Sequence, residues 1–76
     1  MKPAVTLRDL EPGQSAEVVE IASSDTGRLM KLSAFGIVPG SLVTLEQRYP
    51  ACIVRIGETQ LSLDGEVAQE IIIRAE

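Results

Sequence analysis

Few residues of this 76-residue chain carry side chains that do chemistry, and they are scattered. Cys52 is the single cysteine and histidine is absent, so the commonest general base and the commonest metal ligand are both missing. A divalent transition metal needs ligands that converge on one point. The remaining candidates are Cys52 and the carboxylates Glu17, Glu20 and Glu46, and these acids fall on outward strand positions. The pattern predicts no metal site.

Catalytic machinery is not visible either. Asp64 and Glu66 are near neighbours, but they follow an expected strand and open a short turn, where a carboxylate caps backbone N–H groups. No nucleophile has a base beside it, and no glycine-rich segment matches a phosphate-binding loop. Cys52 alternates with Val54 and Ile56, which is typical of a small buried hydrophobic residue. We therefore expect no enzyme activity, no catalytic residue and no cofactor.

Charge and composition exclude further classes. Acidic residues outnumber basic ones by 11 to 7, which gives a net charge of −4, whereas a nucleic-acid binder needs a positive field. Phe35 and Tyr49 are the two aromatic residues, too few for platforms that stack bases. No apolar run approaches the roughly 18 residues of a membrane helix, and no secretion leader follows Met1. We expect a cytoplasmic chain, residues 1–76 forming a single domain, that neither binds nucleic acid nor inserts into a membrane.

Protein contact remains, and four residues are candidates for it. Met30 and Phe35 flank the apolar stripe of an expected helix, with basic Lys31 beside them. Tyr49 lies in a loop next to a proline, and amphipathic aromatic residues are enriched at interfaces. An apolar patch with basic neighbours is typical of a reversible docking surface. The prediction is that Met30, Lys31, Phe35 and Tyr49 meet at one end of the fold and bind a partner, and weak self-association stays open.

The elements that position these residues begin with a helical turn and a strand. Residues 6–10 place a hydroxyl residue three positions before an acid, which is a capping-box pattern. Residues 14–21 are rich in β-branched side chains, and their apolar positions change phase between Val18 and Val19. A change of phase indicates a bulge, as in a barrel strand that turns a corner.

One short helix follows. Leu29 and Leu32 recur at helical spacing, and Gly27 lowers helix propensity, so ordered helix is expected from about Arg28. Gly36 followed by an apolar residue is typical of a Schellman cap, with glycine in the left-handed conformation. Leu29 and Leu32 are then expected to plug one open end of a barrel.

Strands and tight turns make up the rest of the chain. Residues 41–48, 52–56 and 60–63 alternate apolar and polar side chains and predict an antiparallel meander. A helical turn at residues 64–69 and a strand at residues 71–74 complete the order. Turn or cap roles are assigned by residue type to Gly13, Gly36, Pro39 and Gly40. Five short strands are too few for a sandwich, so a small SH3-like or OB-like barrel is expected, whose closure hides the sheet edges.

The helix end and the turn after it resemble a known family. Residues 31–40 read Lys-Leu-Ser-Ala-Phe-Gly-Ile-Val-Pro-Gly, which is similar to the helix end and Leu-Gly-Ile-x-Pro-Gly turn of the ferrous-iron-transport protein A (FeoA) family. Flanking matches are Leu7-x-x-Leu10-x-Pro12-Gly13, Glu66-x-Ala68 and Ile71-x-Ile73. The resemblance covers nearly the whole chain, and Phe35 stands where the family usually has leucine.

The resemblance implies both a fold and a function. The members of the FeoA family are mainly β. We therefore expect a small five-stranded SH3-like barrel with one short α-helix inserted between strands 1 and 2. The family is associated with bacterial ferrous iron uptake, where a small cytosolic protein acts on a membrane iron permease that has a GTPase domain. The resemblance thus implies a regulatory or adaptor protein whose partner is that permease.

Two alternatives stay open. The same module occurs as the carboxy-terminal domain of metal-dependent transcriptional repressors, so the first alternative is a detached unit that regulates such a repressor. The second is an RNA-associated or ribosome-associated SH3-like protein, because Gly13 before a strand resembles a motif of those domains. The net negative charge opposes that second alternative.

Overall fold

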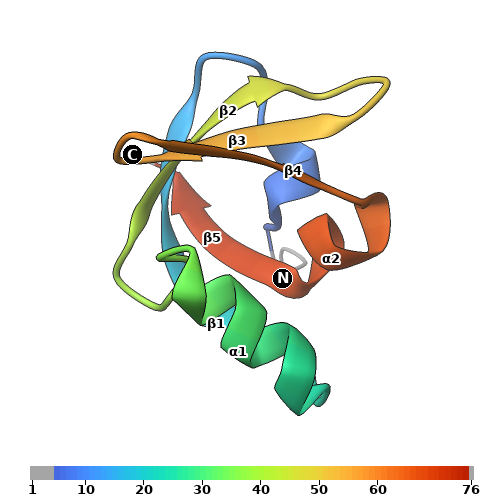
Figure 1. Ribbon diagram of the computed structural model, residues 1–76. Helices are drawn as coiled ribbons and strands as arrows, with labels where there is room; N and C mark the ends of the chain where they lie inside the picture. Colours follow the sequence, from blue (N-terminus) through green and yellow to red (C-terminus); the bar gives the residue numbers. More distant parts are fainter. Residues whose placement is uncertain (1–4, 76) are drawn as a thin grey trace.

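The computed structural model describes residues 5–75, and Figure 1 shows its strands curling around one core. The strands are β1 (Ser15–Ile21), β2 (Leu42–Gln47), β3 (Cys52–Ile56), β4 (Thr59–Leu63) and β5 (Ile71–Ala75). The helical segments are η1 (Leu7–Asp9), α1 (Thr26–Ala34) and α2 (Gly65–Glu70). Across the sheet the order is β4-β3-β2-β1-β5, with every neighbouring pair antiparallel. The predicted mainly β fold of five strands, with one short helix between strands 1 and 2, is confirmed.

The bulge predicted in the first strand is also confirmed. Val18 pairs with Ile73 and Glu20 pairs with Ile72, so Val19 is an extra residue between the two pairs. Val18 is buried, whereas Val19 is exposed. The bulge bends β1, which pairs with β2 through residues 15–17 and with β5 through residues 16–21.

The core lies inside the curl of the sheet. Its buried residues are Leu7, Leu10, Ala16, Val18, Leu32, Ile37, Val43, Leu45, Val54, Leu63, Ala68, Ile71 and Ile73. From α1, Leu32 is the residue that reaches this core, whereas Leu29 is only half-buried, so the expected plug is formed by Leu32 and not by both leucines. Cys52 is half-buried at the margin of the core.

Helix α1 begins at Thr26, two residues before the expected start. The Asp25 carboxylate accepts a hydrogen bond from the backbone N–H of Arg28 at 3.1 Å, which satisfies one of the unpaired donors of the first turn. A cap of this kind contributes about 1 kcal/mol, which offsets the similar cost of Gly27 in the first turn. The cap therefore decides the start of the helix.

The end of α1 has the geometry of a Schellman motif. The N–H of Ile37 donates to the carbonyl of Leu32 at 2.9 Å, and the N–H of Gly36 donates to that of Ser33 at 3.0 Å. Gly36 has φ of 90°, a conformation that β-branched residues avoid. In the next turn, Pro39 precedes Gly40, which has φ of 96°.

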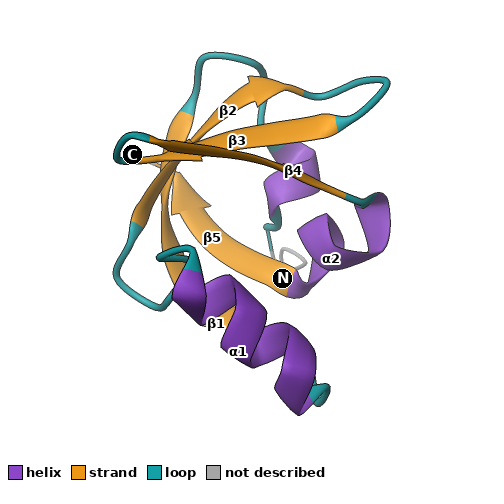
Figure 2. Ribbon diagram, viewed as in Figure 1, coloured by secondary structure: helices purple, strands orange, loops and turns teal. Residues whose placement is uncertain are grey.

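The two edges of the sheet differ. At the β5 edge, Thr6 forms a bridge with Ile72, and the N–H of Ile73 donates to the carbonyl of Val5 at 2.8 Å. Strand β4 pairs with β3, and nothing in residues 5–75 pairs with its other edge. Figure 2 shows α2 joining the two edge strands. The expectation that closure hides both edges is therefore wrong for β4, whose outer side pairs with no strand of residues 5–75.

Candidate functional site

A groove of about 600 Å³ lies between α1 and β4. Lys31 and Phe35 line it at the end of α1, Leu61 lines it from β4, and Val67 lines it from α2. Phe35 is 41% exposed, a large apolar side chain presented to whatever enters the groove. We call this surface the α1–β4 groove.

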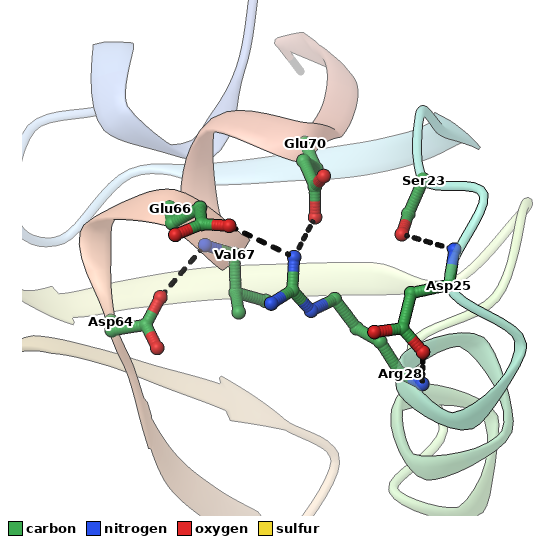
Figure 3. Close-up of polar contacts among 7 residues, drawn as sticks. All are labelled: Ser23, Asp25, Arg28, Asp64, Glu66, Val67 and Glu70. Carbon is green, nitrogen blue, oxygen red and sulfur yellow. Dashed lines mark hydrogen bonds and ion pairs between the residues drawn. The ribbon is translucent and has the colours of Figure 1, made fainter.

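Two carboxylates at the α1–β4 groove serve as helix caps (Figure 3). Asp25 accepts the backbone N–H of Arg28 at 3.1 Å, and Asp64 accepts the backbone N–H of Val67 at 2.9 Å. The capping role predicted for Asp64 is thus confirmed. Each carboxylate keeps its negative charge, which the backbone donors and the positive end of the helix stabilise.

Arg28 connects the two helices. Its Nη1 donates to Oε1 of Glu70 at 2.6 Å and lies 3.6 Å from Oε1 of Glu66, so the side chain reaches from α1 to α2 (Figure 3). The Arg28 and Glu70 side chains are 26% and 24% exposed. The hydrogen bond to Glu70 raises the pKa of Arg28, and partial burial opposes that rise. This ion pair links α1 to α2 and engages the charge of Arg28.

Lys31 is the cation that the α1–β4 groove keeps uncompensated. Within residues 5–75, ion pairs to carboxylates are made by Arg28, Arg48, Arg55 and Arg74. Lys31 makes no ion pair within the same residues, and it is exposed. The groove therefore combines apolar lining side chains with the two capping carboxylates and with Lys31, whose positive charge makes no ion pair among the described residues.

A second groove, of about 670 Å³, lies on the other side of Leu63 and Asp64. Arg8, Tyr49 and Cys52 line it, between the loop after β2 and the start of α2. Tyr49 is 86% exposed. Burial raises the pKa of the Cys52 thiol, and the charge of Arg8 opposes that shift. A thiol with a raised pKa carries little thiolate at neutral pH and is a poor nucleophile or metal ligand.

The four residues predicted to bind a partner are divided between these places. Lys31 and Phe35 line the α1–β4 groove, and Tyr49 lines the second groove. Met30 is 68% exposed on α1 and lines neither groove. Sequence reasoning missed Leu61 as a groove residue. The available signal was that its strand contains no charged residue, which is unusual for a strand with an open edge.

The candidate metal ligands do not gather. Within residues 5–75, no three side chains of the metal-binding types Cys, Asp and Glu lie close enough to hold an ion. Glu17 pairs with Arg74, and Glu46 accepts hydrogen bonds from Arg55 at 2.7 Å and from Gln60. Those two bonds lower the pKa of Glu46 against an opposing effect of burial. None of the described helices is long and apolar enough to cross a membrane.

Solved structures place this fold in a class. An iron uptake regulatory protein (FeoA) matches with a TM-score of 0.84 and 23% identity, over 99% of this chain and 100% of the other. The Stenotrophomonas maltophilia FeoA complexed with zinc matches with a TM-score of 0.82 and 23% identity, over 93% of this chain and 91% of the other. That protein is described as an SH3 domain protein and as a candidate ferrous iron transport activating factor. A manganese-dependent transcriptional repressor matches with a TM-score of 0.87 and 23% identity, over 100% of this chain and 43% of the other. The chain is thus a small SH3-like barrel with a helical insertion.

The particular family follows from the sequence. The model of the FeoA domain matches residues 5–75, so the chain belongs to the FeoA domain family. A comparison with curated protein sequences gives no match. The predicted family is confirmed.

Proposed function

We propose that the chain is a small cytosolic regulatory or adaptor protein of bacterial ferrous iron uptake. In this proposal it acts by contact with the GTPase domain of the membrane iron permease, and not by catalysis. The observation that carries the proposal is the α1–β4 groove, which combines the exposed Phe35 with the unpaired Lys31. Membership of the FeoA family supplies the iron transport system in which that contact takes place.

The small number of anchor residues at the α1–β4 groove favours a contact that forms and releases. Stable protein interfaces bury more than about 1,200 Å² in total, whereas regulatory encounters often bury less. One aromatic anchor and one charge fit such an encounter, because a few residues usually carry most of the binding energy. Regulation of a transport cycle requires reversible binding of this kind.

The test is a calorimetric titration of the purified chain with the cytosolic GTPase domain of the permease. Phe35→Ser and Lys31→Glu are each expected to weaken binding by about tenfold or more, as loss of an interface anchor does. Glu17→Lys is the control, because Glu17 lies on β1 outside the α1–β4 groove. Circular dichroism verifies that each variant is folded. Tyr49→Ser examines the second groove in the same titration.

Two results decide the matter. If the wild-type chain does not bind the GTPase domain, the proposed partner is wrong. If the wild-type chain binds and the folded Phe35→Ser and Lys31→Glu variants bind equally well, the docking surface lies elsewhere.

A second candidate function is regulation of a metal-dependent transcriptional repressor. The observation that favours it is the TM-score of 0.87 with the manganese-dependent repressor, of which this chain spans 43%. A detached module of this kind would alter the affinity of such a repressor for its operator DNA. An electrophoretic mobility shift with and without the chain separates the two functions, because an adaptor of the permease leaves operator binding unchanged.

A further inference from the structure

Strand β4 lacks the features that usually protect an edge strand from pairing. Its five residues, Thr59–Leu63, contain no proline and no charged side chain, and its register with β3 is regular. Natural proteins protect sheet edges with such residues, with bulges or with a covering segment. The opposite edge strand, β5, has a covering segment at Val5 and Thr6. An unprotected edge in a small domain is a surface on which another strand can pair.

The turn before β4 determines which backbone groups face that edge. Gly57 has φ of 61° and the residue after it has negative φ, which is the pattern of a type II′ turn closed by Ile56 and Thr59. The closing pair of such a hairpin is hydrogen-bonded, and hydrogen-bonded pairs then alternate with non-bonded ones along the ladder. Gln60 and Ser62 fall in the non-bonded pairs with β3. Their N–H and C=O groups are therefore directed to the open edge.

The open edge and the α1–β4 groove coincide. Leu61, Ser62 and Leu63 of β4 line the groove together with Phe35. A strand added to β4 would lie roughly 4.8 Å from it, and its side chains would alternate between the two sheet faces. Those on the inner face would contact Leu61 and Phe35, which are both incompletely buried. The groove therefore supplies apolar contacts beside the backbone groups that give affinity.

Charge selects the chemistry of the occupant. Asp25 and Asp64 keep their negative charges at helix N-termini, and Arg28 pairs with Glu70, whereas the side chain of Lys31 has neither a hydrogen-bond nor an ion-pair partner among residues 5–75. An acidic side chain beside Lys31 would gain attraction, whereas a basic one would be repelled. The open groove thus favours a segment that carries a carboxylate.

We propose that β4 binds an extended, acidic segment of a partner protein as a sixth strand, in the mode known as β-augmentation. The segment pairs with the backbone of Gln60 and Ser62, packs an apolar side chain on Phe35 and places a carboxylate beside Lys31. Where the partner is taken to be the permease GTPase domain, this rests on the proposed function. A second copy of the chain is the competing occupant.

Substitution of Ser62 tests the role of its backbone. Both proline and alanine remove the side-chain hydroxyl of Ser62. Proline also removes the outward backbone N–H, without removing a hydrogen bond to β3, whereas alanine keeps that N–H. We expect Ser62→Pro to bind the GTPase domain about tenfold more weakly than Ser62→Ala. Equal affinities in two folded variants would overturn the proposal. If Ser62→Pro does not fold, amide hydrogen exchange of the wild-type chain decides instead.

The exchange experiment has two arms. The labelled wild-type chain is mixed with the GTPase domain or with an eight-residue peptide of alternating valine and threonine that has one central glutamate. A matched peptide carries lysine in place of glutamate. We expect both the domain and the glutamate peptide to slow exchange at the amides of Gln60 and Ser62 by about tenfold or more, and the lysine peptide to bind more weakly.

The outcomes separate the two proposals. If the GTPase domain binds without slowing these two amides, the sixth-strand proposal fails and the proposed function stands. If the domain does not bind but the glutamate peptide protects both amides, the proposed partner fails and the sixth-strand proposal stands. Protection in neither arm overturns the sixth-strand proposal, as does concentration-dependent protection in the chain alone, which would show β4 pairing with a second copy.

Discussion

The two edges of this sheet differ in burial and in what pairs with their outer sides. At the β5 edge, Ile71 and Ile73 are buried, and the segment of Val5 and Thr6 covers the outer side of the strand. At the β4 edge, Leu61 is half-buried and no described residue covers the strand. Burial of apolar area is the main source of folding free energy, so β5 contributes stability, while β4 keeps surface available for binding. Under the sixth-strand proposal, this small domain divides folding and recognition between opposite edges.

The largest effect expected from this comparison is on stability at the β5 edge. Ile71→Ala removes a fully buried side chain and should lower the free energy of unfolding by about 2–5 kcal/mol. Leu61→Ala, on the β4 edge, should cost about 1–2 kcal/mol because that side chain is already partly in water. Urea unfolding measures both. Equal losses would remove the distinction between the two edges.

The next effect concerns the helix beside the open edge. Gly36→Val should destabilise the chain by about 1–3 kcal/mol, because valine is strained at φ of 90° and its Cβ would meet Ile56 Cγ2 at 3.4 Å. Gly65→Ala is the control, since Gly65 begins α2 with open space around it and without positive φ. Its melting temperature should stay level or rise slightly. An unchanged melting temperature in Gly36→Val would exclude the strained cap.

The local elements could be predicted from the sequence because their causes are local. The phase change at Val18 and Val19 indicates the bulge, and residue type alone suggests the helix stop at Gly36. The start of α1 was missed because the propensity of Gly27 was weighed without the strength of the Asp25 cap. The bulge and the helix stop can be predicted directly from local sequence patterns. The start of the helix is harder to predict, because the cost of Gly27 and the stabilisation by the Asp25 cap are of similar size.

The candidate site could be predicted only in part, because its parts are distant in sequence. An apolar residue with a basic neighbour at the margin of the helical stripe indicates Phe35 and Lys31 as partner-binding residues, and both line one groove. Tyr49 lines another groove. The division depends on where β4 and α2 lie relative to α1, which no local pattern specifies. The open edge of β4 was missed for the same reason, since pairing of the edge strands is a property of the whole sheet.

A smaller effect is expected from the contact that holds α1 beside the open edge. Arg28→Met removes the ion pairs to Glu70 and Glu66, and it should lower the melting temperature less than Ile71→Ala does. Arg74→Met is the control, because its ion pair with Glu17 joins more exposed side chains. Added salt should narrow the difference between wild type and Arg28→Met, since salt screens ion pairs near the surface. A wild-type melting temperature for Arg28→Met would show that α1 is held by packing alone.

The smallest effect is a pH dependence on the outer face beside β4. Hydrogen bonds from Arg55 and Gln60 lower the pKa of Glu46 below its ordinary value of 4.5. A carboxyl whose folded pKa is lowered stabilises the fold above the ordinary value, and this contribution is lost as pH falls through the folded pKa. Wild type should therefore lose slightly more stability than Glu46→Gln between about pH 7 and about pH 3. Parallel pH profiles by urea unfolding would contradict this assignment.

Chemical-shift mapping of the labelled chain with the permease GTPase domain tests the central claim most directly. We expect the largest changes at the α1–β4 groove and the open edge, at Lys31, Phe35, Leu61 and Ser62. The buried β5 edge, at Ile71 and Ile73, should change little. Changes concentrated at Arg8 and Tyr49 in the second groove, or no changes at all, would contradict the account.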